Sequence, residues 1–440
     1  MMRALSLIAG AALLVWPAFV NGYPLIFVDT ASYLLHPTPW NGPWDKAAAY
    51  GPLLQLLHWG GTLWFPLTAQ ALLLSALLWL TQRVATGVVT PWRHLALCLA
   101  LSLLTTAPWF NATIMPDIFA PSVVLCLFLL GFGEHRLSRT ELVVVAVVGA
   151  VAVAVHLSHL PTACAIAALV VLLRGRLMPA LRAAAPIAAA MLFLVGANLV
   201  TFGRATPSPH GAIFVLARMQ EDGPAMATLR AHCPRSGWTL CDAVGTLPMT
   251  SNDFVWLPGS PLRIGLDGQM RHPMAMAPEA QSIVLATIRE QPFAVARDMM
   301  ENTLVQLVTT QLGDTLDQTQ LPETARLAIT DRFPAAELAR FDAGMQARGT
   351  LEAFGAHFAR VQGATAVLAL GLIPILLWRV VRRGDRSRTA ILLCVLVGIL
   401  ANAFVTGALS GPFDRYAARI VWLLPLACLL TLIPIRANRA

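Results

Sequence analysis

Two polar residues near the N-terminus, Asp29 and Tyr33, have the types and spacing that could support chemistry at a membrane surface. They lie at 23–34 in Tyr-Pro-Leu-Ile-Phe-Val-Asp-Thr-Ala-Ser-Tyr-Leu, directly after an apolar segment. If 29–34 is helical, the two side chains share one face and can look into one cleft. A carboxylate placed there could act on a lipid-linked substrate. In the alternative interpretation, Asp29 caps a short interfacial helix that Tyr33 anchors at the headgroups.

A second acid, Asp117, ends a short polar turn between two apolar runs. It stands in Met-Pro-Asp-Ile-Phe-Ala-Pro, where Pro116 and Pro121 could fix a turn at the mouth of a membrane helix. An Asp before an apolar run is a common helix-capping signal. An acid at a membrane boundary is also a candidate for function. Both interpretations of Asp117 stay open.

Two histidines, His156 and His159, follow in the turn His-Leu-Ser-His-Leu-Pro. Helical metal ligands can use a spacing of three, but no cysteine and no Glu-x-x-His pattern accompanies this pair. A hydrogen-bonded pair of histidines is the alternative to a metal site. As a general base, one of them would suit a membrane acyltransferase.

The composition indicates the protein class. Hydrophobic residues make up 57% of the chain and charged residues only 12%, in long apolar runs separated by short arginine-bearing loops. This pattern is typical of a polytopic membrane protein. The arginines flank apolar runs and form no basic stripe on a soluble domain, so the positive net charge does not predict nucleic-acid binding.

The apolar runs predict an all-α polytopic protein with about ten transmembrane helices. A crossing helix needs about 20 residues, so the short runs 118–133 and 161–174 could be re-entrant, which would leave nine. The first run follows Arg3 as a signal peptide would, but no small-x-small cleavage site follows it, so we treat it as a span. The candidate spans are 4–20, 66–82, 94–110, 118–133, 141–157, 161–174, 184–202, 363–379, 389–408 and 419–435.

Arginines in alternate loops predict the orientation. By the positive-inside rule the arginine-bearing loops are cytoplasmic, which places both termini inside, and all the polar clusters then fall on the outer side. We expect an integral protein of a bacterial inner membrane. The cytoplasmic set is Arg3, Arg83, Arg93, Arg136, Arg139, Arg174, Arg176, Arg182, Arg379, Arg382, Arg383, Arg386, Arg388, Arg436 and Arg439. The outer segments are 21–65, 111–117, 156–161, 203–362 and 411–419.

This topology divides the chain into three parts. Residues 1–202 form an N-terminal transmembrane module whose first outer loop, 21–65, contains leucines and tryptophans suited to an interfacial helix at 45–59. Residues 203–362 are long enough for a periplasmic domain, and their apolar positions recur at helical spacing. Residues 363–440 supply the C-terminal transmembrane helices.

The order of these features resembles the GT-C superfamily of integral-membrane glycosyltransferases, which take a sugar from a polyprenyl-phosphate donor on the extracytoplasmic face. The resemblance covers residues 1–202 well and the C-terminal half only loosely. It implies that Asp29 corresponds to the catalytic acid of the first outer loop, and Asp117 to the acid of the second. Many members carry paired acids, whereas Thr30 follows Asp29 here. This departure counts against a bound divalent metal, and no other cofactor is expected.

Several other residues of the outer segments could bind the substrate. Arg415 or Arg419 could clamp a phosphate with a planar guanidinium, or an Asp-Arg pair around Asp414 could hold the last helices together. Arg204 and His210 lie near the membrane, either within reach of a phosphate or in ordinary surface roles. The candidate substrate-binding residues are Tyr33, Tyr50, Arg204, His210, Arg415 and Arg419.

These observations predict transfer of a sugar from a polyprenyl-phosphate donor to a lipid, glycan or protein acceptor. Asp29 would be the general base if partial desolvation raises its pKa toward neutrality, and Asp117 would orient the acceptor or tune Asp29. A lipid-glycan flippase is the non-enzymatic alternative. A transporter should place polar groups at mid-membrane and show repeated halves, and the sequence shows neither.

Two of the seven cysteines lie in the outer domain, in Cys-Pro-Arg-Ser-Gly-Trp-Thr-Leu-Cys. An oxidising compartment and a turn containing Pro and Gly favour closure, so we predict a disulfide between Cys233 and Cys241. The others lie in apolar runs, where cysteine acts as a small hydrophobe: Cys98, Cys126, Cys164, Cys394 and Cys428.

Overall fold

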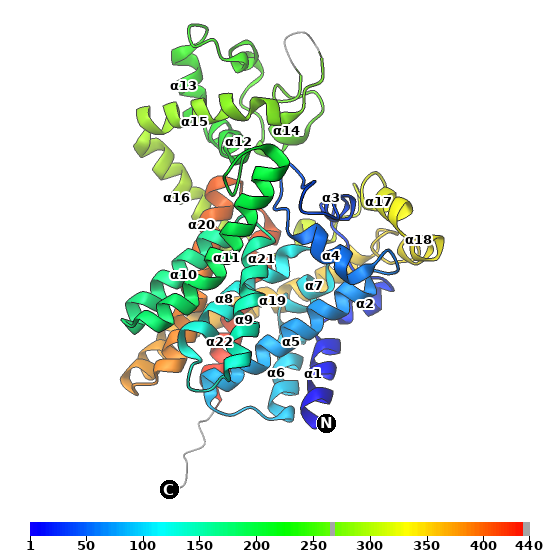
Figure 1. The fold of residues 1–440 in the computed structure, drawn as a ribbon, viewed down its shortest axis with the longest axis vertical. Helices are drawn as coiled ribbons and strands as arrows, with labels where there is room; N and C mark the ends of the chain where they lie inside the picture. The colour runs from blue at the N-terminus through cyan, green and yellow to red at the C-terminus, as the bar shows by residue number, and fades with distance from the viewer. Residues whose placement is uncertain (265–268, 434–440) are drawn as a thin grey trace.

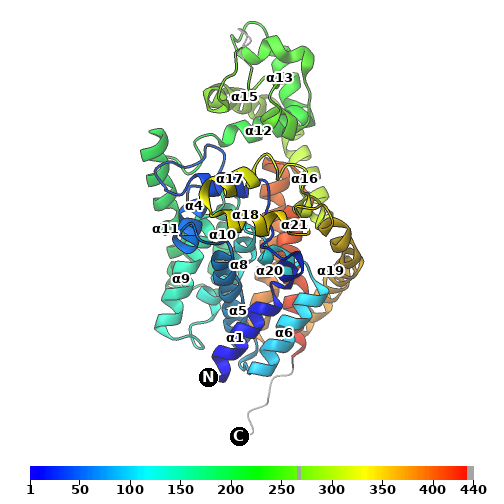
Figure 2. The same cartoon turned by 90° about the vertical axis from the view of Figure 1, so that its right-hand side faces the viewer.

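The computed structural model describes residues 1–264 and 269–433 and is built from helices. The chain is 73% helical, and the described residues form no β-strand, only two isolated bridges. Apolar runs fold as helices because a helix satisfies its backbone hydrogen bonds internally, as a membrane requires. Figures 1 and 2 show a helix bundle with a smaller group of helices at one end and the N-terminus at the other.

Among the described residues, five helices are long and apolar enough to cross a membrane. A helix rises about 1.5 Å per residue, so about 20 residues match the hydrocarbon thickness. The chain is therefore compatible with an integral membrane protein. The five are α5 (Trp64–Thr86), α11 (Leu177–Phe202), α19 (Leu351–Arg382), α20 (Arg386–Leu409) and the consecutive α21 and α22 (Asp414–Leu432).

The other apolar runs form shorter helices, and two are interrupted. The first run folds as α1 (Met2–Leu13) and α2 (Trp16–Asn21), and another as α6 (Pro91–Leu104) and α7 (Ala107–Ala112). Pro108 stands in the first turn of α7, where its missing N–H is tolerated and where it cannot continue the preceding helix. The remaining short helices of the bundle are α8 (Phe119–Phe132), α9 (Arg139–Ala154) and α10 (His159–Arg174).

The arginine-bearing connections gather at the end of the bundle that holds the N-terminus (Figure 1). Glu141 pairs with Arg83 at 2.5 Å, and Glu134 pairs with both Arg174 and Arg182. These contacts bring loops that alternate along the sequence to one side, as the arginine pattern requires. Two arginines assigned to this side, Arg436 and Arg439, lie outside the described residues.

A separate group of helices forms the opposite end. α12 (Gly211–Asp222), α13 (Pro224–His232), α14 (Ser251–Trp256) and α15 (Ala277–Glu290) pack around a hydrophobic core distinct from that of the bundle. We call these helices the outer unit. α16 (Pro292–Val308) leads from the outer unit back along α20 (Figure 1).

A disulfide joins Cys233 to Cys241 in the outer unit. It closes the turn after α13 onto a 3₁₀ helix, Thr239–Thr246. A second 3₁₀ helix, Pro273–Met276, leads into α15. The disulfide therefore fixes the 3₁₀ helix whose Leu240 packs in the core of the outer unit.

The chain after α16 returns to the bundle. α17 (Ala325–Arg332) packs against α3 (Thr30–Leu35), and α18 (Ala335–Asp342) follows it. The buried Glu337 of α18 accepts hydrogen bonds from Tyr23 Oη and from the Leu63 backbone N–H, each at 2.9 Å.

The stretch 203–362, which was expected to form one domain, contributes residues to two separate hydrophobic cores. Residues of the outer unit surround their own core, whereas Leu316 and Phe341 join the core of the bundle. The expected boundary at 363 lies inside α19, which begins at Leu351.

Candidate functional site

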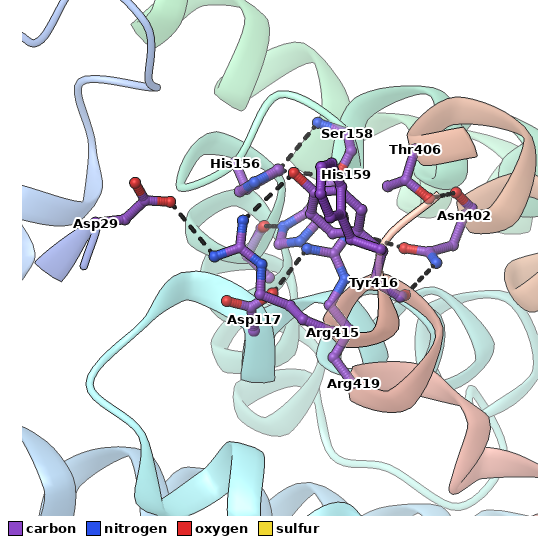
Figure 3. Close-up of polar contacts among 12 residues, drawn as sticks. Asp29, Asp117, His156, Ser158, His159, Asn402, Thr406, Arg415, Tyr416 and Arg419 are labelled. Atoms are coloured by element: carbon purple, nitrogen blue, oxygen red, sulfur yellow. Dashed lines mark hydrogen bonds and ion pairs between the residues drawn. The ribbon is translucent and has the colours of Figure 1, made fainter. Parts of the chain in front are cut away.

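Asp29 lies at the start of α3, and its carboxylate faces two cations. The side chain makes no capping hydrogen bond to this helix. Instead, Oδ1 lies 3.3 Å from Lys46 Nζ and Oδ2 lies 3.4 Å from Arg415 Nη1. Figure 3 shows Arg415 reaching across to Asp29. The capping role considered from the sequence is wrong, because the carboxylate is held by charges.

The neighbouring charges decide the pKa of Asp29. Burial alone would raise this pKa, but Lys46 and Arg415 outweigh burial and hold the pKa below its usual value. Burial opposes the charge of Lys46 as well, yet Asp29 and Asp45 hold the pKa of Lys46 above its usual value. The expectation that desolvation raises the pKa of Asp29 toward neutrality is therefore wrong for this arrangement of charges.

Asp117 lies in the 3₁₀ turn Pro116–Ile118 and forms a buried ion pair with Arg419. Arg419 Nη1 donates to Asp117 Oδ1 at 3.0 Å, while Nη2 donates to Ser158 Oγ at 3.0 Å and to Asn402 Oδ1 at 2.8 Å. The Arg419 side chain is fully buried, and 3% of the Asp117 side chain is exposed. Figure 3 shows these groups converging on one guanidinium. Through these hydrogen bonds Arg419 connects four separate segments of the chain.

Both arginines belong to α21 (Asp414–Val421), and their spacing of four places them on one face of the helix. The Tyr416 ring lies 5.0 Å from each guanidinium carbon, and the Phe27 ring lies 4.1 Å from that of Arg415. The backbone carbonyl of Tyr416 accepts a hydrogen bond from Asn402 Nδ2 at 2.7 Å. α21 is thus fixed to α20, and its two arginines point into the cluster.

Asp414 makes a different contact from the one considered from the sequence. Its Oδ1 accepts a hydrogen bond from the Gln311 backbone N–H at 3.3 Å. The ion pairs that anchor α21 within the described residues run from Arg415 to Asp29 and from Arg419 to Asp117. The structural ion pair that the last outer loop could supply therefore involves Arg419.

His156 and His159 lie at the edge of this cluster (Figure 3). Their ring centroids are 5.1 Å apart, but each ring bonds to another group. His156 Nδ1 lies 2.8 Å from Ser158 Oγ, and His159 Nδ1 lies 2.6 Å from the Ala152 carbonyl. Among the described residues, no group of three His, Cys, Asp or Glu side chains could hold a metal ion.

Tyr33 and Tyr50 contact one another next to the acids. Their rings meet edge to face at 4.9 Å, and both side chains are buried. Tyr50 begins α4 (Tyr50–His58), which lies within the interfacial helix predicted at 45–59. In the described part of the chain, the Tyr50 hydroxyl is buried without a hydrogen-bond partner.

Arg204 and His210 do not join the cluster. Arg204 is exposed in the loop after α11. His210 Nδ1 lies 3.0 Å from the Trp44 carbonyl, and its ring packs against Phe202 at 4.9 Å. Arg204 therefore has the surface position considered from the sequence, whereas His210 is buried and has a packing role.

A cavity of about 510 Å³ lies beside the Asp29–Arg415 pair. Phe27 and Val28, which directly precede Asp29, form one wall of it. Gly411, Pro412 and Phe413, which lead into α21, form another. The outer unit and the turn at 314–321 complete the lining. The cavity is therefore lined by residues of both the outer unit and the bundle, including the segments that lead into Asp29 and Arg415.

A third acid, Asp314, lines this cavity from the 3₁₀ helix Gly313–Leu316. Burial raises the pKa of Asp314, although the positive charge of the nearby Arg415 lowers it. Its Oδ1 is buried without a partner among the described residues. Arg415 thus lies between the carboxylates of Asp29 and Asp314.

Several residues of the site could not be singled out from the sequence. Lys46 is the single lysine of the chain, and this rarity was the one available signal. Asp314 and Asn402 stand in stretches with no distinctive pattern, so only the fold reveals them. The missed residues are Asp45, Lys46, Ser158, Asp314 and Asn402.

Comparisons of this chain with models of protein families, with curated proteins and with solved structures each find no match.

Proposed function

We propose that this protein is a membrane glycosyltransferase resembling the GT-C superfamily, which moves a sugar from a polyprenyl-phosphate donor to an acceptor. The observation that carries the proposal is the carboxylate of Asp29 held between Lys46 and Arg415 beside a large cavity. A glycosyltransferase that uses a phosphate donor needs a base for the acceptor and a cation for the phosphate leaving group. This cluster offers both at the end of an apolar helix bundle.

The proposed topology follows from the two ends of the molecule. The end rich in arginines is cytoplasmic and the outer unit is periplasmic, with about ten spans between them. A single cysteine at the exposed Met270, in a chain without other free cysteines, should react with an impermeant maleimide in intact cells, whereas one at the exposed Arg386 should not. Labelling of position 270 only after the membrane is breached would contradict this orientation.

In the proposed mechanism the donor phosphate competes with Asp29 for Lys46 and Arg415. A guanidinium can bind two phosphate oxygens at once. When the phosphate takes these cations, Asp29 loses its counter-ions and its pKa rises. The site would thus generate its own base when the donor binds, which accommodates the low pKa of Asp29 before binding.

The chemical step then balances within the site. Asp29 accepts the proton of the acceptor hydroxyl as the acceptor oxygen bonds to the anomeric carbon. The bond between that carbon and the phosphate oxygen breaks, and polyprenyl phosphate leaves with the electron pair. Lys46 and Arg415 stabilise the negative charge of this leaving group.

Acyl transfer is the alternative that His156 and Ser158 would support, since they lie 2.8 Å apart. However, Ser158 is buried, and its hydroxyl oxygen accepts a hydrogen bond from Arg419. A hydrogen bond from a guanidinium draws electron density from the hydroxyl oxygen and lowers its nucleophilicity, and burial keeps an acyl donor away from it. We therefore do not propose acyl transfer.

The test is transfer by the purified chain in lipid vesicles containing a polyprenyl-phosphate hexose. We expect wild-type protein to release polyprenyl phosphate when an envelope glycan extract is added, and the Asp29→Asn variant to fail. Release that needs no acceptor, or that is equal in both proteins, would contradict the proposed function.

A further inference from the structure

The cavity beside Asp29 has the position and size of a ligand site. Its volume of about 510 Å³ lies within the range of about 300–1,000 Å³ common for small-molecule pockets. One wall, Phe27 and Val28, directly precedes Asp29 in the chain. The opposite wall belongs to the outer unit, at Thr250, Ser251 and Asn252. A molecule in the cavity would therefore contact the segments that lead into Asp29 and Arg415.

The lining carries excess negative charge. Among the described residues that line it, Arg218 is the one cation, against Glu221, Asp314 and Asp317, which gives +1 − 3 = −2. Arg218 is already engaged, because Nη1 lies 3.0 Å from Glu221 and Nε donates to Asp222 at 2.9 Å. An anionic ligand would find no free cation on these walls and would be repelled by the acids.

The remaining lining suits hydroxyl groups. Asn252 and Gln320 are exposed and line the cavity, and the partly exposed Asp314 lines it as well. A ligand hydroxyl could donate a hydrogen bond to the carboxylate of Asp314. The aromatic rings of Phe27 and Phe413 add apolar surface of the kind that the C–H faces of sugar rings contact.

We propose that this cavity is the acceptor site and that it takes an uncharged, polyhydroxylated acceptor of the carbohydrate class, oriented by Asp314. Its role as an acceptor site rests on the proposed function, since it lies beside the base proposed there. The charges then sort the two substrates: the phosphate of the donor goes to Lys46 and Arg415, and the neutral acceptor goes to the acidic cavity. Asp314 is a positioning residue in this scheme.

The test is cysteine protection, which needs no turnover. A cysteine at Asn252 in a Cys164→Ala background is labelled with N-ethylmaleimide; the other free cysteines are buried. Methyl glucoside at ten times its Kd should slow labelling about ten-fold, whereas glucose 6-phosphate at the same concentration should not. Asp314→Asn should raise the methyl glucoside concentration needed for half-maximal protection by about ten-fold or more, the cost of a charge-assisted hydrogen bond. A cysteine at Met270, which is exposed outside the lining, is the matched control and should be unaffected.

Equal protection by both sugars, or none by methyl glucoside, would overturn the proposal. Full protection of the Asp314→Asn chain would remove the role of Asp314. Protection by methyl glucoside in a chain that never consumes a polyprenyl-phosphate sugar would contradict the proposed function while supporting a carbohydrate site. Transfer of sugar without protection by methyl glucoside would support the proposed function and contradict the carbohydrate site in this cavity.

Discussion

Two pairs of an acid and an arginine lie one turn apart on α21, and they differ in burial and in hydrogen bonding. Arg415 meets Asp29 at 3.4 Å, with 11% and 26% of the two side chains exposed. Arg419 meets Asp117 at 3.0 Å in full burial and donates to Ser158 and Asn402 as well. The same residue types at helical spacing therefore produce one partly exposed ion pair near a cavity and one fully buried ion pair with additional hydrogen bonds.

This difference teaches which pair can exchange partners. Removing one member of a buried ion pair costs about 3–5 kcal/mol, because the other charge stays buried and uncompensated. The pair of Arg415 and Asp29 keeps some exposure, so water can partly solvate its two charges and separating them costs less. Arg415 can thus release Asp29 for a substrate phosphate at small cost, whereas Arg419 cannot release Asp117 without loosening the fold.

The largest expected effect is on turnover. Asp29→Asn should lower sugar transfer by about 10²–10⁴-fold, the usual contribution of a general base, with a thermal midpoint close to that of wild type. The measurement is the initial rate beside a melting curve in detergent. Asp342→Asn is the matched control, because it neutralises an exposed acid paired with Arg326 at 2.9 Å far along the chain. Full turnover by Asp29→Asn would contradict the difference between the two pairs.

Arg419→Met should destabilise the protein by about 3–5 kcal/mol, since it leaves Asp117 buried without a counter-charge. Unfolding in a denaturing detergent measures this change. Adding Asp117→Asn should recover part of the loss, because the buried charge is then removed. If Arg419→Met is as stable as wild type, the ion pair between Arg419 and Asp117 does not stabilise the fold.

The disulfide tests whether the outer unit is stable independently of both pairs. Replacing Cys233 and Cys241 by serine should cost about 2–3 kcal/mol, the value for a short loop. Limited proteolysis should show faster cleavage within the outer unit while the bundle resists. Equal loss throughout the chain would mean that the outer unit and the bundle unfold together.

The smallest effect concerns pH. A lowered pKa means that the Asp29 pair stabilises the fold above the unfolded pKa of about 3.9, and that this stabilisation is lost as the pH falls through the folded pKa. The difference in melting temperature between wild type and Asp29→Asn should therefore stay constant from pH 7 to pH 5 and shrink below pH 4. A difference that already disappears at pH 6 would mean that Asp29 is not held ionised by its cations.

The sequence predicts much of this architecture because its signals are local. The apolar runs became helices, although among the described residues only five helices are long and apolar enough to cross a membrane. The arginine-bearing loops meet at one end, where they pair with Glu134 and Glu141. The acids and arginines that later meet in the cluster could also be singled out, since charge beside an apolar run is unusual. Composition and spacing carry this information without the fold.

The partners of those charges could not be predicted in the same way. Asp29 and Arg415 are 386 residues apart, and one sequence carries no trace of their contact. The pKa of Asp29 depends on that contact, so the expected direction of its shift was wrong. Asp314 could not be anticipated either, because its role follows from the return of the chain to the bundle after α16.

The most direct test of the exchange of partners at Arg415 is a structure of the protein bound to a non-hydrolysable phosphonate analogue of a polyprenyl-phosphate sugar. We predict that its phosphonate oxygens lie within about 2.7–3.2 Å of the Arg415 guanidinium. Asp29 should have parted from Arg415, while Arg419 and Asp117 keep their contact. A phosphonate bound elsewhere, with the contact between Asp29 and Arg415 intact, would contradict the account.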